Sequence, residues 1–557
     1  MTAAANTEGS STRNAAVLTL VAILGLLLRI FFSRYHPLDH NGGWHLFIAR
    51  NFRREYANLA HPPLFLLLLK GCDRVSHTLA AYRFFPVLAS VGSIVLVGRI
   101  LQKLGTLSPV AVLGALVFAC AQTSILLSLE VESYTLCVFL MLASFLCYLD
   151  LVTADARPPK RSRILFSTFA SLALLSHYFA GLYLVVCVAA PLVAATMRPE
   201  YRRALRSSLR RRWFADVLTL LFPFLVGLVL YLTLAKPWVR SLDNMPTYYF
   251  RPGEEPLSSF WIRNLRETFN LFAPFPVARA RWALPPLLLF LAGVLWAPAT
   301  EKSETGRSPD RLLPAVFLWL LLLGGMLLGA IGRYPFGGLM RQQFLLFVFA
   351  LLAGCVAVDR LFRFAGGVGR ILLVAICLAA VGADFKLGLR GTTTPDYAHE
   401  ALVGRRGIYA RHLAGRGTVH VDAFNLIGVM MDFYGWDWRF EGPDPAVPSV
   451  ERYELTRGGK RLNLLVHRWI WIMDFQSPGL YAELSKSLGP RAACETVFCV
   501  DRNLYGPPWT KRPPKNRAAL LASIPALAAN VGVRVRRVEV TDDAIDVVLC
   551  ETGSGPP

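Results

Sequence analysis

The sequence predicts an all-α polytopic membrane domain of about eleven transmembrane helices, followed by a small α/β domain on the outer side of the membrane. Hydrophobic residues make up 54% of the 557 residues and charged residues only 17%, whereas soluble domains average about 45–50% and 25%. Long apolar runs recur as far as residue 384, and basic residues gather in the short loops between them. Because ionisable side chains are costly in lipid, this composition suits a membrane protein.

The formal net charge of +22 arises mainly in the apolar part of the chain. From residue 385 onward there are 22 Lys and Arg against 18 Asp and Glu, so only +4 belongs to that region. No Gly-rich phosphate loop or aromatic basic motif accompanies the charge. We therefore expect no nucleic-acid partner, and we interpret the basic loops as a topology signal.

The first apolar run, residues 15–33, is long enough to cross about 30 Å of hydrocarbon. It lacks a small-residue cleavage site and many runs follow it, so we interpret it as an uncleaved first helix. The other expected spans cover residues 84–101, 109–127, 134–152, 164–176, 178–196, 214–234, 284–299, 312–331, 343–359 and 370–384.

The strongly basic short loops all fall on one side if the N-terminus is cytoplasmic. These loops are 99–103, 157–163, 198–212 and 360–370. Such a bias is the usual mark of the inner side, and it predicts a multi-pass protein, surrounded by membrane lipids, with its N-terminus in the cytoplasm. The first long loop, the loop 236–283 and the C-terminal region then lie outside.

Three regions are expected along the chain: a cytoplasmic tail (1–14), the membrane domain (15–387) and an outer α/β domain (388–557). Alternating apolar residues predict strands in the last region, and amphipathic stretches predict helices. The expected strands are 418–422, 463–473 and a hairpin 533–540/544–550, and the expected helices are 397–414, 480–488 and 516–530. If this region is exported, Cys494 and Cys499 could form a disulfide.

The first outer loop gathers polar residues that could carry chemistry: His36, Asp39, His40, His45 and His61. A divalent metal is one alternative for the histidines with Asp39, but their spacing matches no standard signature. Solvated loop histidines are the alternative that we favour, so no metal or other cofactor is assigned.

Four motifs follow one another along the outer loops: HPPL at 61–64, SLEVESYTL at 128–136, SHYFAGLYL at 176–184 and GRYPFGGLMRQQFLLF at 332–347. Together with an acid after the first span, they resemble the polytopic glycosyltransferases of the C superfold. The most similar members are bacterial relatives of the protein O-mannosyltransferases and of the lipid A and lipopolysaccharide-core sugar transferases. The resemblance covers roughly residues 15–385.

The resemblance implies transfer of a sugar from a polyprenyl phosphate to a lipid, glycan or protein acceptor, with inversion. Asp39 matches the acid that serves as general base in that family, and Glu130 matches the acid of the second motif. Arg341, Arg333 and His61 are the candidates to hold the leaving phosphate. An alternative for Asp39 is a helix N-cap before Asn41 and Gly42.

Other positions depart from the family pattern or have two interpretations. His40 stands where the family often has Glu, and Glu132 stands where Arg is common. His177 and Tyr178 could contact the donor or anchor the chain at the membrane interface. Arg341 could likewise snorkel to the interface instead of binding phosphate.

Two rival functions remain open from sequence alone. A transporter or flippase would place its ionisable residues near the bilayer midplane, whereas the notable acids and histidines here fall in outer loops. A non-catalytic member of the same fold would have lost the base, and the Asp39–His40 departure leaves that alternative open. The outer domain is expected to cap the outer face and contribute to the choice of acceptor.

Overall fold

A computed structural model of the chain groups its residues into two compact units that are discontinuous in sequence. The membrane unit comprises Met1–His36, Phe52–Leu69 and Arg83–Asp396, and the sheet unit comprises Pro37–Asn51, Lys70–Tyr82 and Tyr397–Pro557. The structure describes residues 2–34, 36, 38–52, 62–153, 159–197, 199, 202, 218–235, 250, 252–253, 255–272, 311–334, 336–337, 340–389, 408–413, 417–422, 425–445, 448, 450–467, 495–501, 535–541 and 545–551.

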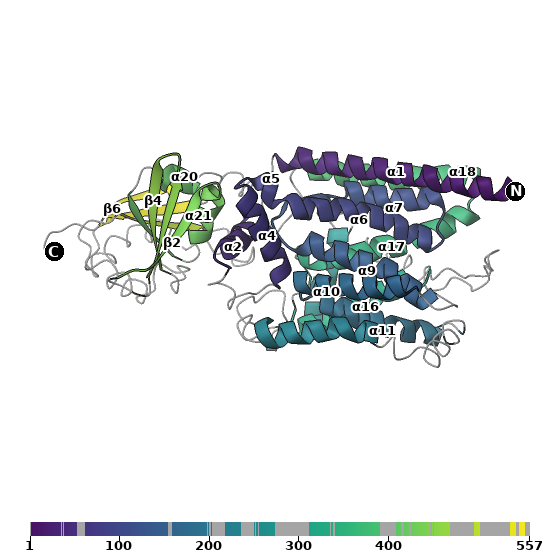
Figure 1. Ribbon diagram of the computed structural model, residues 1–557. Helices are drawn as coiled ribbons and strands as arrows, with labels where there is room; N and C mark the ends of the chain where they lie inside the picture. Colours follow the sequence, from purple (N-terminus) through teal and green to yellow (C-terminus); the bar gives the residue numbers. More distant parts are fainter. Residues whose placement is uncertain are drawn as a thin grey trace. The chain divides into compact units, whose positions relative to one another are not determined.

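The membrane unit is built of long apolar helices that lie side by side with nearly aligned axes (Figure 1). Its described helices are α1 (Thr2–Ser33), α6 (Phe84–Lys103), α7 (Ser108–Cys120), α8 (Gln122–Leu129), α9 (Tyr134–Thr153), α10 (Lys160–Ser176), α11 (Ala180–Met197), α14 (Leu257–Phe272), α16 (Leu313–Ala330), α17 (Met340–Phe364) and α18 (Gly367–Leu389). A short π-helix covers Tyr231–Ala235, and α4 (Pro63–Val75) contributes residues to both units.

The expected count of about eleven spans is not confirmed. Among the described residues, six helices are long and apolar enough to cross a membrane, or up to seven if α7 and α8 form one bent span. The expected span 214–234 is represented by a shorter apolar helix, Leu218–Thr233, and the expected span 284–299 lies outside the described residues. The mostly helical membrane part and the C-terminal sheet agree with the predicted fold class.

A buried arginine stabilises the break between α7 and α8, which are bent by 49°. Ala121 takes an extended conformation there, with ψ 126°. A break leaves carbonyl groups without helical partners, and Arg29 of α1 donates to one of them, Ala119 O, at 3.2 Å. The same guanidinium donates to the hydroxyls of Ser90 and Ser124 and is fully buried. Arg29 thus fixes the bend that leads into the motif at 128–136.

The buried carboxylate of Asp359 connects the start of α7, the start of α16 and the end of α17. Asp359 of α17 is fully buried and accepts from Leu107 N at 2.7 Å. It pairs with Arg363 at 2.9 Å and with Arg311, just before α16, at 3.3 Å. This ion cluster therefore links α16 and α17 to the start of α7.

Asp359→Asn should lower the stability of the membrane unit by about 2 kcal/mol, because two arginines lose a charged acceptor while the amide can still accept from Leu107 N. The measurement is the thermal unfolding midpoint of the full chain in detergent. Asp437→Asn, which removes a mostly exposed carboxylate, is the matched control. An unchanged midpoint for Asp359→Asn would contradict the structural role of the cluster.

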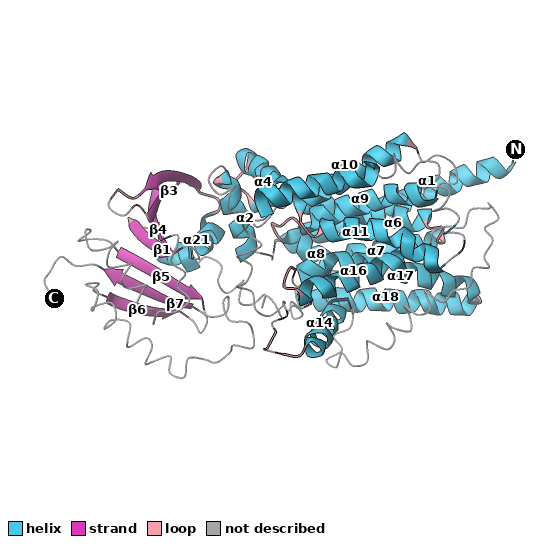
Figure 2. Cartoon of the chain, turned by 90° about the horizontal axis from the view of Figure 1, so that it is seen from below, coloured by secondary structure: helices cyan, strands magenta, loops and turns pink. Residues whose placement is uncertain are grey.

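The sheet unit contains a seven-stranded mixed sheet of order β2-β3-β4-β1-β5-β7-β6. The strands are β1 (Thr418–Asp422), β2 (Asp437–Pro443), β3 (Val450–Arg457), β4 (Lys460–His467), β5 (Glu495–Asp501), β6 (Val535–Thr541) and β7 (Ile545–Glu551). β1 runs parallel to β4 and β5, and the other pairs are antiparallel. Figure 2 shows these strands in magenta, with α21 beside β1.

Most of the expected C-terminal elements that fall on described residues are present. The strand 418–422 and the hairpin near 533–550 are found as β1 and β6/β7, and the start of 463–473 lies in β4. The expected helix 397–414 is described only as α20 (Ile408–Leu413). The expected helices 480–488 and 516–530, and Cys494, lie outside the described residues. The side chain of Cys499 is not described either.

A helix of the loop after the first span packs within the sheet unit. This helix, α2 (His40–Arg50), lies against α21 (Asn425–Phe433). Gly43 permits the close approach, since a Cβ there would lie 3.1–3.3 Å from atoms of Met431 and Ile427. The segment that carries Asp39 thus belongs to the same unit as the C-terminal sheet, whereas the boundary at residue 388 stays a prediction.

Candidate functional site

Asp39 is the N-cap of helix α2. Its carboxylate Oδ1 accepts from Gly42 N at 3.1 Å, and its side chain is almost fully buried. This is the capping geometry that the sequence offered as an alternative. The cap fixes the orientation of the carboxylate at the start of a rigid helix, which is compatible with the proposed role as a base.

The other histidines of the loop are placed unequally. His45 is buried in α2, where its Nδ1 lies 2.7 Å from Asn41 O. His36 belongs to the membrane unit, and its carbonyl accepts from Arg83. The side chain of His40 and all of His61 lie outside the described residues. Within the described part of the chain, no group of three or more His, Cys, Asp or Glu side chains is placed to hold a metal ion.

Glu132 and Arg341 form a buried ion pair in the membrane unit. Their atoms Oε1 and Nη1 are 3.0 Å apart, and the side chains are only 3% and 14% exposed. Burial raises the pKa of Glu132, and the positive charge of Arg341 opposes that rise. Glu132 lies in the loop between α8 and α9, and Arg341 lies in the first turn of α17. Two of the four motifs therefore meet at this pair.

Glu130 lies in the same loop but has a different local role. It is the C-cap of α8, its own N–H donates to Leu126 O, and its side chain is 8% exposed. The structure thus buries both acids of the second motif. Arg333, by contrast, is exposed in the turn that follows α16.

The third motif joins the other two through aromatic contacts. His177 is the C-cap of α10 and its ring lies 4.7 Å from that of Tyr134 and 6.4 Å from that of Tyr334. The ring of Phe179 stacks on Tyr334 at 4.6 Å. His177 is buried within this cluster, so the simple membrane-anchor interpretation does not describe its surroundings. Tyr178 is also in this turn and is half-buried.

Several buried polar atoms near these motifs have no hydrogen-bond partner among the described residues. They are Ser133 Oγ, Thr135 Oγ1, Gln342 Oε1 and both amide atoms of Asn264. Asn264 of α14 contacts Gly337 closely enough that a Cβ there would meet it at 2.5 Å. Buried polar groups normally find partners, so these atoms retain hydrogen-bonding capacity that no described residue uses. Ser133, Thr135 and Gln342 lie inside the quoted motifs without having been proposed as site residues, and Asn264 lies outside all four motifs.

Arg83 holds the ends of two helices at the same side of the membrane unit. Its guanidinium donates to Leu129 O at the end of α8 (2.6 Å), to Ser33 O at the end of α1 (3.0 Å) and to His36 O (2.7 Å). Carbonyl groups at helix C-termini carry partial negative charge and favour a cation. Arg83 therefore fixes, within the membrane unit, both the loop of Glu130 and the chain that follows α1 as far as His36.

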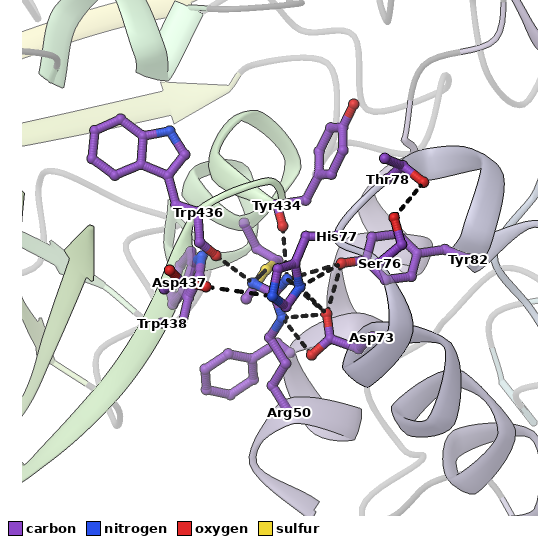
Figure 3. A network of polar contacts seen from close by, with 12 residues as sticks. Arg50, Asp73, Ser76, His77, Thr78, Tyr82, Tyr434, Trp436, Asp437 and Trp438 are labelled. Carbon is purple, nitrogen blue, oxygen red and sulfur yellow. Dashed lines mark hydrogen bonds and ion pairs between the residues drawn. The ribbon is translucent and has the colours of Figure 1, made fainter. Parts of the chain in front are cut away.

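Within the sheet unit, Arg50 and Asp73 form the centre of a polar network (Figure 3). Arg50 Nη2 lies 2.8 Å from Asp73 Oδ1, and Arg50 Nε lies 3.0 Å from the same oxygen. Arg50 also donates to Tyr434 O at 2.7 Å and to Trp436 O at 3.3 Å. The network joins the end of α2 to the turn between α21 and β2.

The protonation of Asp73 depends on this network. Burial alone would raise the pKa of its carboxyl. Hydrogen bonds and charge from Arg50, with hydrogen bonds from Tyr82 and His77, outweigh that effect and hold the pKa below its ordinary value. His77 also lies between two carboxylates, with Nδ1 2.9 Å from Asp73 and Nε2 3.4 Å from Asp437. The Asp73 carboxylate is therefore a stabilising charge of the sheet unit.

The fold of this chain was compared with those of known proteins, and similar solved structures were found. No protein-family model matches the chain, and no curated protein has a matching sequence. A crystal structure of ArnT from Cupriavidus metallidurans bound to undecaprenyl phosphate is similar over 99% of each chain, with 13% identity and a TM-score of 0.50. The same protein in the apo state matches over 98% of each chain, with 12% identity and a TM-score of 0.50.

A second protein is more distant. The Archaeoglobus fulgidus oligosaccharyltransferase, tethered to an acceptor peptide with an NVT sequon, matches 76% of this chain and 63% of its own, with 11% identity and a TM-score of 0.43. The similarity to ArnT, at low identity, concerns the fold. It confirms the fold that the four motifs led us to expect.

Proposed function

We propose that this chain, which has the fold of the C-superfold glycosyltransferase ArnT, transfers a sugar from a polyprenyl phosphate to a hydroxyl acceptor. The observation that carries the proposal is the meeting of three outer motifs in the membrane unit, with the Glu132–Arg341 pair and the His177–Tyr134–Tyr334 cluster. Within these motifs, Ser133, Thr135 and Gln342 retain buried hydrogen-bonding atoms without a described partner, which a polar ligand such as a sugar would satisfy. The complex of ArnT with undecaprenyl phosphate supports a donor of that class.

The reaction follows from the chemistry of the donor. The acceptor oxygen attacks the anomeric carbon, the bond from that carbon to the phosphate oxygen breaks, and the polyprenyl phosphate leaves with the bonding electrons. The acceptor proton passes to the carboxylate of Asp39, which acts as general base. Attack from the face opposite the phosphate inverts the anomeric centre. The step requires no oxidant or reductant.

The leaving phosphate needs cationic donors. We assign this role to Arg341, with Arg333 and His61 as further phosphate contacts. The ion pair with Glu132 holds the Arg341 guanidinium in one orientation before the donor arrives. Glu130, Glu132, His40, His177 and Tyr178 complete the proposed substrate-binding set.

The location of the reaction is the outer face of a bacterial inner membrane, with the N-terminus in the cytoplasm. This part of the proposal is supported by the basic loops 99–103, 157–163, 198–212 and 360–370. The acceptor is a lipid, a glycan or a protein.

The proposal is tested by sugar transfer with the purified full chain in proteoliposomes. The donors are undecaprenyl-phosphate-linked hexoses and pentoses, and the acceptors are envelope lipids, glycans and hydroxyl-bearing peptides. Release of undecaprenyl phosphate that requires an acceptor supports the proposal. Movement of intact donor across the membrane without cleavage would instead show a flippase.

Arg341→Gln should weaken binding of undecaprenyl phosphate about tenfold, because a charge-assisted contact to the phosphate is lost. Arg341→Lys keeps the positive charge but loses the planar guanidinium with its paired N–H donors, so it should weaken binding less than Arg341→Gln does. The measurement is the dissociation constant in detergent by native mass spectrometry. Arg370→Gln, at an exposed site, is the control. Equal affinities for all four proteins would remove Arg341 from the phosphate site.

A further inference from the structure

A cavity lies at the opposite end of the membrane helices from the three motifs. It has a volume of about 580 Å³ and is lined by residues of α6, α9 and α10. Its residue Asp150 follows Tyr134 along α9 by sixteen positions, which corresponds to about 24 Å of helix. The volume falls within the range of about 300–1,000 Å³ that is usual for small-molecule sites. The proposed transferase chemistry does not use this cavity.

The lining of the cavity is strongly basic. It includes Arg99, Lys103 and Arg161 against a single acid, Asp150. Asp150 is already engaged, because Lys103 Nζ lies 2.5 Å from its Oδ1 and Ser162 Oγ donates to its Oδ2 at 3.0 Å. Arg99 and Arg161 make no ion pair or hydrogen bond with any other residue that the structure describes. Two positive charges thus remain available at the cavity.

A further polar atom at the cavity lacks a protein partner. Gln102 lines it, and its buried amide nitrogen has no hydrogen-bond partner in the described part of the chain. Leu146 and Leu165 add apolar surface to the same lining. Cationic and amide donors beside aliphatic side chains suit a ligand with an anionic head and an apolar body.

We propose that this cavity binds the phosphate of an anionic membrane phospholipid. Arg99 and Arg161 hold the phosphate charge, Gln102 donates to a head-group oxygen, and Leu146 with Leu165 contact the apolar part of the lipid. Basic pockets between transmembrane helices bind anionic head groups in this way. The lipid would join α6, α9 and α10 at their shared end, independently of the transferase reaction.

The test is lipid binding to the purified, delipidated full chain, measured by native mass spectrometry. Dioleoyl phosphatidylglycerol is the anionic probe, dioleoyl phosphatidylcholine is the zwitterionic one, and glycerol 3-phosphate supplies the head group without acyl chains. The double variant Arg99→Gln/Arg161→Gln removes the two available charges. Lys160→Gln/Arg370→Gln removes two exposed cations outside the cavity lining and is the matched control.

We expect phosphatidylglycerol to bind the native chain more tightly than phosphatidylcholine. The cavity variant should lose about tenfold or more of this affinity, while the control should stay within about twofold of the native chain. Both variants change exposed side chains, so their lipid-free unfolding midpoints should match that of the native chain. Equal binding of the two lipids, or native-like binding by the cavity variant, would overturn the proposal. Displacement of the lipid by equimolar glycerol 3-phosphate would show a site for soluble phosphate esters instead.

Discussion

Asp39→Asn should lower the turnover number for sugar transfer by at least about a hundredfold, because loss of a positioned general base typically costs 10²–10⁴-fold. Asparagine is as good an N-cap as aspartate, so the contact with Gly42 N and the start of α2 should be preserved. The replacement therefore separates the proposed chemistry from the observed capping role. The KM for the donor should change little, since Asp39 is assigned to the acceptor proton.

The measurement is steady-state transfer in proteoliposomes, with kcat and KM determined separately. Asp437→Asn is the control, because it removes an exposed carboxylate of the same unit. The thermal unfolding midpoint of both variants should match that of the native chain. Transfer at the native rate by Asp39→Asn would leave Asp39 as a cap and require another base.

The sequence predicts long membrane helices well because their signal is local. Eighteen or more apolar residues in succession identify a span without knowledge of its neighbours, and α9 and α16 lie within two residues of their expected limits. The break between α7 and α8 was missed, since the run 109–127 carries no charge and its three polar residues, Gln122–Ser124, are compatible with one continuous span. The bend depends on hydrogen bonds from Arg29, a residue about 90 positions away along the chain.

In the C-terminal region, too, a strand with a clear local pattern was predicted and one without such a pattern was missed. The apolar alternation of Thr418–Asp422 predicts β1 with the observed bounds. β3 was missed because its buried positions, Val450, Tyr453 and Leu455, do not follow a strict period of two. The register of its partner β2 shifts between Phe440 and Gly442, and a bulge of this kind disturbs alternation.

The site was predicted only as a set of separate motifs. The expected spans and loop charges predict outer loops for Glu132, His177 and Arg341, but nothing local indicates that Arg341 pairs with an acid 209 positions away. The unpartnered polar atoms of Asn264 and Gln342 are visible only after folding. Arg50 and Asp73 carried no motif at all, although their ion pair organises the unit that bears Asp39.

Asp73→Asn should destabilise the sheet unit by about 3 kcal/mol, because it leaves the Arg50 guanidinium, only 7% exposed, without its charged partner. The amide also accepts more weakly from Tyr82, whose hydroxyl now lies 2.7 Å from the carboxylate. Release of α2 from the turn between α21 and β2 should follow. Hydrogen exchange of residues 40–50 in the full chain measures this release, and the thermal midpoint measures the stability.

The same pair predicts the acid sensitivity of the unit. The pKa of Asp73 in the folded chain lies below its ordinary value of 3.8. Its contribution to stability is therefore fully present above that value and is lost as the pH falls toward the lower folded pKa. The native chain should lose stability in this window more steeply than Asp73→Asn, whereas Asp437→Asn should follow the native curve to within about 0.5 kcal/mol. If the stabilities of the native chain and of Asp73→Asn fell in parallel with pH, the network would contribute no charge-dependent stability. The position of α2 would then depend on its packing against α21.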